Sequence, residues 1–398
     1  MQFFLISQTN TVLRRTFAML LITIYSMVSV TLLETITIAD EPGALNPDET
    51  ARPVVTNKRS SLIIKEAFAK TKTAKTIDQY EEIIQLCRQV MDGEASEARK
   101  TYTRQLKSWA HNRRGELLAN EAARLAAEAN DKKAQWADRQ AFEDFETAIT
   151  LDPTRWKAYH NRGVSHAMAM QYDKAIEDFN EAIELHPKYA NTWFNRAEIH
   201  SEQGQFEAAI SDYTQVIRLA ADDAGAYAGR AHANYRLGQY NQSLSDYSSA
   251  VQLDPANPEV YTNRAEAYSS FGYWKRAASD FRKAIELPNA QGRSYQTAAW
   301  MMATCPDANF RNSTLALKTA KKAIEINVEP NYRYIDTLAA AYANAGNYEE
   351  AQTTIERAIE IAPENAVDRL ENRLALYIEK KPYRLVVRTA SSSDTERR

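Results

Sequence analysis

The sequence predicts an all-α protein, built as a solenoid of antiparallel helix pairs. Glycine and proline together supply 23 of 398 residues, 11 and 12 respectively, and β-sheets need many tight turns that use these two residues. Similar residues return every 34 positions through the centre of the chain, and a fixed period of this length is typical of stacked helical repeats. Glycines such as Gly204 and Gly238 recur at the same point of the period, where a first helix must end.

Residues 1–39 are predicted to be a signal peptide or an N-terminal membrane anchor. Arg14 and Arg15 precede Thr16–Leu33, an uncharged and mostly apolar run of 18 residues, and this order is typical of an export signal. Cleavage before Asp40 would place the protein in the periplasm or another extracytoplasmic compartment. Retention would leave a membrane attachment through residues 16–33, because 18 residues are just enough to span a bilayer.

Residues 40–60 contain three prolines and few large apolar groups, and we expect a flexible linker there. Residues 389–398 are polar and are expected to form a disordered tail.

Charge and composition exclude several function classes. The net charge is −3 and the isoelectric point is about 6.2, so no overall field attracts nucleic acid, and no nucleic-acid partner is expected. The two cysteines, Cys87 and Cys305, are too few for a disulfide framework or a zinc site of their own. No phosphate-binding glycine-rich loop, His-Glu-x-x-His or Gly-x-Ser-x-Gly motif occurs. We therefore expect no catalytic residue, no metal and no cofactor.

Four consecutive blocks of 34 residues align without a gap, and they start at Trp156, Ala190, Ala224 and Pro258. Small residues at the eighth and twentieth positions let two antiparallel helices approach closely, and aromatic residues at the fourth and twenty-fourth positions fill the space between successive pairs. The eighth positions are Gly163, Ala197, Ala231 and Ala265, the twentieth Ala175, Ala209, Ser243 and Ala277, the fourth Tyr159, Trp193, Tyr227 and Tyr261, and the twenty-fourth Phe179, Tyr213, Tyr247 and Phe281.

This pattern resembles the tetratricopeptide repeat (TPR) family, and the resemblance covers residues 156–289. It implies a right-handed TPR solenoid that acts as a protein–protein interaction scaffold. The predicted order is N-terminal helices with a variant first TPR (61–153), four regular units (154–289), a variant TPR with an extended turn (290–329), a last TPR (330–363) and a C-terminal capping helix (364–388). The extended turn, Cys305-Pro306-Asp307, resembles a module of bacterial TPR proteins.

The variant first unit contains an insertion. Gly115 to Ala141 spans 26 positions where Gly163 to Ala175 spans 12, so about fourteen residues are added. The inserted segment is rich in alanine, glutamate and lysine, which predicts longer helices instead of a separate fold. Amphipathic helices over residues 77–90 and 368–380 are expected to cap the two ends.

Two features of the repeats could be structural or functional. His166 and His200 share the eleventh position, where either two stacked imidazoles hold a metal or each ring replaces a packing tyrosine; we favour packing. Arginine at the seventh position is matched by aspartate at the twenty-third, as in Arg264 and Asp280. This ladder could bind anions, but the two residues appear and disappear together, which favours helix-to-helix ion pairs that fix register and add only about 0.5 kcal/mol each if half-exposed.

The resemblance also implies a concave groove, lined by first helices, that binds a partner protein or an extended peptide. Phe194 and Tyr235 are the candidate aromatic anchors of this groove. The TPR subclass that clamps chaperone tails is excluded, because no unit has its Lys/Asn pair at the fifth and ninth positions. Carried over by position, the candidate groove residues are Lys157, His160, Asn161, Phe194, Asn195, Glu198, His232, Tyr235, Arg236, Asn263 and Glu266.

Two alternatives remain open at this point. A purely structural role by end-to-end self-assembly predicts an uncovered apolar face on the helix over residues 368–380. An enzyme with a site in the insert over residues 92–140 is less favoured, because the residues considered there resemble a charged amphipathic helix and lack the spacing of an acid/base pair. These residues are Glu94, Glu97, His111, Glu116, Glu121 and Trp136.

Overall fold

The computed structural model describes residues 58–327 and 329–386, which form seventeen α-helices and one short 3-10 helix, with no strand in these ranges. The predicted all-α class is therefore confirmed. The chain divides into two compact units within helix α8 (Ala190–Glu202), between Ile199 and His200. Residues 16–33, most of the expected linker, and residues 389–398 lie outside the described residues. In the described ranges, no helix has the length and apolar character needed to cross a membrane.

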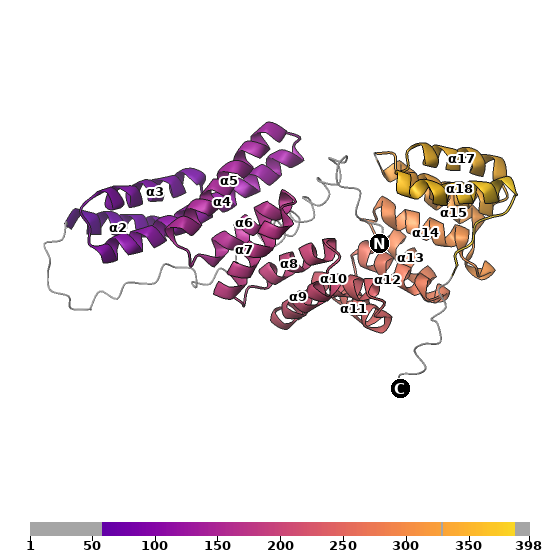
Figure 1. Ribbon diagram of the computed structural model, residues 1–398, viewed down its shortest axis with the longest axis horizontal. Coiled ribbons are helices and arrows are strands. Elements are labelled where there is room, and N and C mark those ends of the chain that lie inside the picture. Colours follow the sequence, from indigo (N-terminus) through magenta and orange to yellow (C-terminus); the bar gives the residue numbers. More distant parts are fainter. Residues whose placement is uncertain (1–57, 328, 387–398) are drawn as a thin grey trace. The chain divides into compact units, whose positions relative to one another are not determined.

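The first unit begins with helices that pack against the long α4 (Figure 1). The insertion lengthens α4 to 31 residues and α5 to 21, against 13 or 14 in the regular repeats, as the composition predicted. The bounds are α2 Lys58–Thr71, α3 Ile77–Asp92, α4 Glu97–Ala127, α5 Asp131–Leu151, α6 Trp156–Met168 and α7 Tyr172–Leu185, followed by α8.

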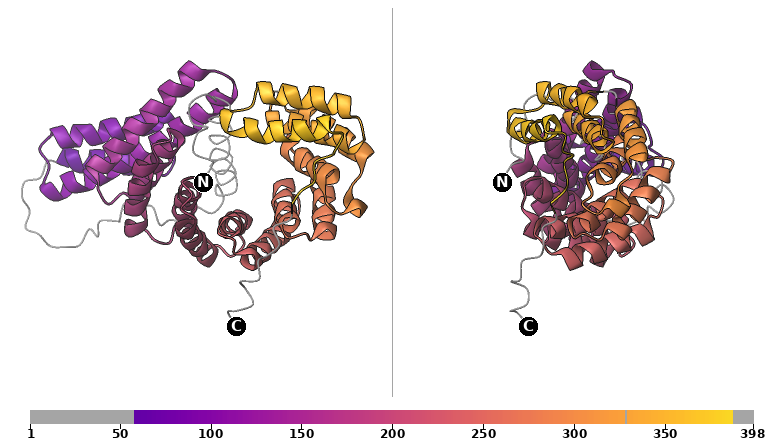
Figure 2. Two further views of the ribbon diagram at one scale, coloured as in Figure 1. Left: turned by 45° about the vertical axis from the view of Figure 1, so that its right-hand side comes forward. Right: turned by 90° about the vertical axis from the view of Figure 1, so that its right-hand side faces the viewer.

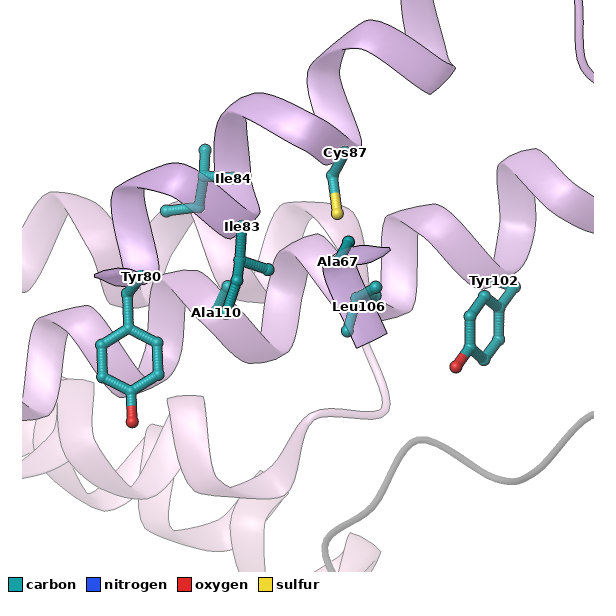
Figure 3. Close-up of a cluster of buried hydrophobic side chains, with 8 residues drawn as sticks. All are labelled: Ala67, Tyr80, Ile83, Ile84, Cys87, Tyr102, Leu106 and Ala110. Carbon is teal, nitrogen blue, oxygen red and sulfur yellow. The ribbon is translucent and has the colours of Figure 1, made fainter. Parts of the chain in front are cut away.

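Helix α2 corrects the expected linker, because it starts at Lys58, inside residues 40–60. Its apolar side chains repeat at helical spacing: Ala67 is buried, and Ile64 and Phe68 pack beside it. Figure 3 shows the resulting cluster, in which α3 places Cys87 toward Ala67. Burial raises the pKa of this thiol to about 12. Cys87 is therefore a core residue of the N-terminal cap.

The second unit continues as helix pairs, with α18 lying along α17 at its C-terminal end (Figure 2). The extended Cys-Pro-Asp turn contains the 3-10 helix η1 between α14 and α15. The bounds are α9 Phe206–Leu219, α10 Ala224–Arg236, α11 Tyr240–Leu253, α12 Pro258–Ser270, α13 Trp274–Glu286, α14 Gly292–Thr304, η1 Ala308–Phe310, α15 Ser313–Ile326, α16 Tyr332–Asn344, α17 Tyr348–Glu360 and α18 Glu364–Ile378.

The C-terminal end of the described chain consists of a capping helix and an extended segment that follows it. Helix α18 runs over Glu364–Ile378 where residues 368–380 were expected. The extended segment that follows returns to α14: the Leu385 N–H donates to the Thr304 carbonyl at 2.8 Å, and Arg384 Nη1 donates to the Ala303 carbonyl at 2.9 Å. These carbonyls lie in the last turn of α14, where helical partners are lacking. We name residues 381–386 the C-terminal strap.

The turns between paired helices use a left-handed residue, as the recurring glycines predicted. Gly204, Gly238 and Gly272 have φ of 75°, 76° and 73°. Met170 stands at the same position of the first regular repeat and also has a positive φ of 59°. Left-handed backbone costs a residue with a Cβ roughly 1–2 kcal/mol, so this repeat carries strain that the others avoid.

We expect the substitution Met170→Gly to stabilise the protein by about 0.5–1 kcal/mol, because glycine removes the Cβ clash but loses part of that gain to unfolded-state entropy. Little packing is lost, since Met170 is 43% exposed. Thermal unfolding followed by circular dichroism measures the change. Ala169→Gly is the matched control, because Ala169 has an ordinary φ of −80° and should gain nothing. Equal shifts in both variants would contradict the strain.

Candidate binding surface

The arginine–aspartate ladder forms helix-to-helix ion pairs, as its paired occurrence predicted. Arg264 Nε and Nη2 donate to Asp280 Oδ2 and Oδ1 at 2.7 and 2.9 Å, and Arg230 holds Asp246 in the same bidentate way at 2.8 Å. The same fork joins Arg162 to Asp178 and Arg114 to Asp144. These four aspartates are buried. The pairs thus satisfy buried carboxylates between the two helices of one repeat and present no row of cations to an anion.

The fourth-position aromatic residues complete this arrangement. The guanidinium of Arg230 lies 5.7 Å from the ring centre of Tyr227, and that of Arg264 lies 5.7 Å from Tyr261. Arg196 also has the aromatic contact, 5.0 Å from the Trp193 ring centre, and it donates to Asn180 Oδ1 at 2.5 Å. The seventh-position arginines are therefore part of the repeat framework.

The eleventh-position histidines belong to the same framework. His166 Nδ1 is 2.8 Å from Gln171 Oε1, and its Nε2 is 3.8 Å from the buried Asp178. His200 repeats this geometry with Gln205 at 2.6 Å. Throughout the described part of the chain, no three histidine, cysteine, aspartate or glutamate side chains gather as a metal site would require. These contacts support packing and hydrogen bonding as the role of both histidines.

Two of the residues named for the insertion, His111 and Glu116, are also held by neighbours. His111 Nδ1 lies 2.7 Å from Asp144 Oδ1, and Glu116 accepts hydrogen bonds from Asn112 and Arg113 at 2.8 and 2.5 Å. The His111 contact joins α4 to α5, and the Glu116 contacts join neighbouring turns of α4. These contacts give His111 and Glu116 a structural role.

In the first unit, three predicted groove residues are buried, and two of them contact a neighbouring first helix. His160, Asn161 and Asn195 are 5%, 6% and 8% exposed. His160 Nδ1 lies 2.9 Å from Thr192 Oγ1, and Asn161 Nδ2 donates to Asn112 Oδ1 at 3.1 Å. The fifth and sixth positions here face the neighbouring first helix, so these side chains connect repeats. Lys157, Phe194 and Glu198 remain partly exposed.

The buried His160 predicts an acid-sensitive first unit. Burial lowers the pKa of His160 to about 3 from its ordinary 6.5, and Lys157 adds to this effect. Between pH 6.5 and pH 3, His160 is therefore protonated in the unfolded state and neutral in the folded state, so the free energy of unfolding falls as the pH drops through this range. We expect His160 to account for a loss of about 2 kcal/mol between pH 6.5 and pH 5.

Urea unfolding of the wild type and of His160→Gln at pH 7 and pH 5 measures this contribution. The glutamine keeps a polar group beside Thr192 but cannot titrate. The wild type should lose more stability than the variant on acidification. An equal loss in both proteins would rule out His160 as the acid-sensitive group.

In the second unit, the predicted residues lie on a polar face of the first helices that is exposed or partly exposed. His232 and Arg236 of α10 are exposed, and the Arg236 guanidinium lies 4.5 Å from the Phe206 ring centre. Tyr235 is partly buried, and its hydroxyl is 2.7 Å from Ser270 Oγ. The eleven candidates are thus not equivalent: His160, Asn161 and Asn195 are buried, and the other eight, including those on α10 and α12, are exposed or partly exposed.

Arg293 of α14 is a residue of this face that the sequence argument missed. Its guanidinium donates to Asn263 Oδ1 at 2.8 Å and to Glu266 Oε2 at 2.7 Å, and it lies 3.6 Å from Glu259 Oε1. The signal was available, because Arg293 occupies the second position of the variant repeat, which faces the groove in the family pattern. We name His232, Arg236, Asn263, Glu266 and Arg293 the first-helix surface.

Comparison with known families identifies the repeats. Profiles described as tetratricopeptide repeat match residues 156–189, 179–211, 258–291 and 332–365, and a profile described as TPR repeat matches 198–238 and 232–272. The matches run without a gap from 156 to 291, through all four predicted regular units. No curated protein matches the sequence.

Solved structures of similar fold are distant in sequence. A tetratricopeptide repeat protein from Parabacteroides merdae is 16% identical with a TM-score of 0.49, covering 66% of this chain and 98% of its own. Yeast Tom70 is 16% identical with a TM-score of 0.45, covering 92% and 74%. MamA from Desulfovibrio magneticus is 19% identical with a TM-score of 0.39, covering 44% and 96%.

Proposed function

We propose that this chain, whose residues 156–291 and 332–365 are tetratricopeptide repeats, is a non-catalytic scaffold that binds an extended segment of a partner protein on its first-helix surface. Repeats of this family typically act as interaction scaffolds. A helical solenoid completes its core between neighbouring repeats and leaves an elongated surface available to an extended chain.

The observation that carries the proposal is the Arg293 cluster. Arg293 is 44% exposed at its side chain, and it joins α14 to Asn263 and Glu266 of the preceding repeat. The repeat core does not need this contact, because the core of these helices is formed by Ala265, Phe281 and their apolar neighbours. The cluster instead holds polar side chains of the successive first helices α12 and α14 in fixed positions. Their hydrogen-bond donors and acceptors are therefore already ordered before a peptide binds.

The self-assembly alternative loses its main support at the C-terminal end. Helix α18 buries Ala366, Leu370 and Tyr377, and its exposed positions are mainly polar, including Asp368 and Glu371. A mainly polar face of this kind offers no large apolar patch on which a second copy of the chain would pack.

Photo-crosslinking in cells that naturally produce the protein tests the scaffold function. The full chain would carry p-benzoylphenylalanine at His232 of α10 or, as a matched control, at Lys283 of the second helix α13; both positions are exposed. We expect a defined protein adduct from the His232 position only, and its loss when Arg293→Glu is added. Absence of any adduct, or an equal adduct from the control position, would overturn the proposal.

A further inference from the structure

Five aromatic side chains gather at the helix turns of the third and fourth regular repeats, within the second unit. The ring centres of Tyr240 and Phe271 are 4.1 Å apart, and Tyr235 lies 6.2 Å from Tyr240. Tyr273 lies 6.2 Å from Phe271 and 6.3 Å from Tyr268. Tyr240 and Tyr273 are 37% and 51% exposed. We name these five residues the turn aromatic patch.

Three members of the patch are not required by the repeat fold. Tyr235, Phe271 and Tyr273 occupy the twelfth, fourteenth and sixteenth positions, and the other regular repeats form the same helix pair and turn with small, polar or aliphatic residues there. The twelfth positions are otherwise Ala167, Ser201 and Ser269, the fourteenth Ala169, Gln203 and Leu237, and the sixteenth Gln171, Gln205 and Gln239. Partly exposed aromatic groups that packing does not demand indicate a contact surface.

Positive charge borders the patch. The Arg276 guanidinium lies 5.7 Å from the ring centres of both Tyr268 and Tyr273, and Lys275 beside it is exposed. No acidic residue occurs over residues 237–245 or 268–278, the two segments that form the turns. The patch therefore offers apolar ring faces and edges together with cations that have no carboxylate within these segments.

We propose that the turn aromatic patch binds an acidic segment of a partner protein, whose apolar side chains pack on the rings while its carboxylates pair with Lys275 and Arg276. This inference rests on the proposed function in one respect, that the partner is a protein, and it assigns the contact to a surface other than the Arg293 cluster. Aromatic rings beside cations also suit single-stranded nucleic acid. Two cations are few for tracking a phosphate backbone, and the chain has a net charge of −3, so the acidic peptide is favoured.

Fluorescence anisotropy with a defined probe tests the proposal on the full chain. The probe is a labelled peptide in which glutamate alternates with tryptophan and proline. Its controls are the same peptide with every glutamate replaced by lysine, and a labelled thymidine oligonucleotide. We expect the acidic peptide to bind, and the lysine peptide to bind about tenfold more weakly or not at all. Failure of the acidic peptide to bind at millimolar concentration, or tighter binding of the oligonucleotide, would overturn the proposal.

Variants taken from the other repeats separate binding from folding. Phe271→Gln with Tyr273→Gln installs residues that the same positions hold elsewhere in the array, so the melting temperature should stay unchanged. The double variant should weaken the acidic peptide about tenfold or more, the loss expected when aromatic anchors are removed. Met170→Gln, at an exposed apolar position in another turn, is the control that should bind normally.

The two proposals can fail separately. Unchanged peptide affinity in the double variant would overturn the patch, while the crosslink from His232 and its loss with Arg293→Glu would still stand. Conversely, the acidic peptide could bind normally and depend on Tyr273 while His232 gives no adduct. That result would support the turn aromatic patch and overturn the first-helix surface as the binding site.

Discussion

Replacing Arg264 by methionine is expected to lower the free energy of unfolding by about 3 kcal/mol. The Arg264 guanidinium is the bidentate partner of Asp280, and the two side chains are 15% and 10% exposed. Methionine keeps much of the packing volume but leaves the Asp280 carboxylate without its cation in a largely dehydrated site. Urea unfolding followed by circular dichroism measures the loss.

A double variant distinguishes pairing from packing. Arg264→Met with Asp280→Leu removes both charges, and it should recover most of the stability, because an apolar pair of similar size often replaces a buried ion pair without loss. Arg124→Met is the surface control: Arg124 pairs with Glu121 and Glu128 at exposed positions, and its loss should leave the unfolding curve unchanged. A double variant no more stable than Arg264→Met would show that the ion pair is not the source of the effect.

Gly229→Asn is expected to destabilise the second unit by about 3 kcal/mol, although asparagine is the residue at this sixth position in the three other regular repeats. A Cβ on Gly229 would lie 2.3 Å from Cζ of Tyr213, and Tyr213 is only 1% exposed, so its ring has no room to move away. Thermal and urea unfolding measure the loss.

The clash with one ring can be isolated by removing that ring. In a Tyr213→Leu background, the added effect of Gly229→Asn should fall well below its effect in the wild type, since the atoms nearest the new Cβ are gone. Equal increments in both backgrounds would assign the loss to helix backbone or solvent effects and contradict the steric explanation.

The repeat period made much of the fold predictable, because a fixed spacing determines which positions meet. Gly238 was expected at a helix end from its recurrence, and the structure gives it a left-handed backbone. Asp280 was expected to pair with an arginine sixteen positions earlier, since the two residue types vary together, and Arg264 holds it. Both inferences needed only local geometry that each repeat copies from the one before.

Features that occur once were not predictable in this way. Helix α2 begins at Lys58, because its apolar side chains meet α3, a partner that the composition of residues 40–60 does not reveal. His160 was assigned to a solvent-facing position by family pattern, yet contact between neighbouring first helices buries it. Whether such a position is open depends on how closely two helices approach, and this varies from repeat to repeat with the side chains between them.

The C-terminal strap determines when the chain can finish folding during synthesis. A regular repeat completes its packing once the next repeat has left the ribosome, but α14 waits for Arg384, 81 residues after Ala303. Arg373 lies 4.8 Å from the ring centres of both Trp300 and Tyr383, so this contact too forms only after residue 383 has been made. Until residues 373–383 have been made, the indole of Trp300 lacks this cover, so a chain interrupted before residue 380 contains an unfinished repeat instead of a shorter complete array.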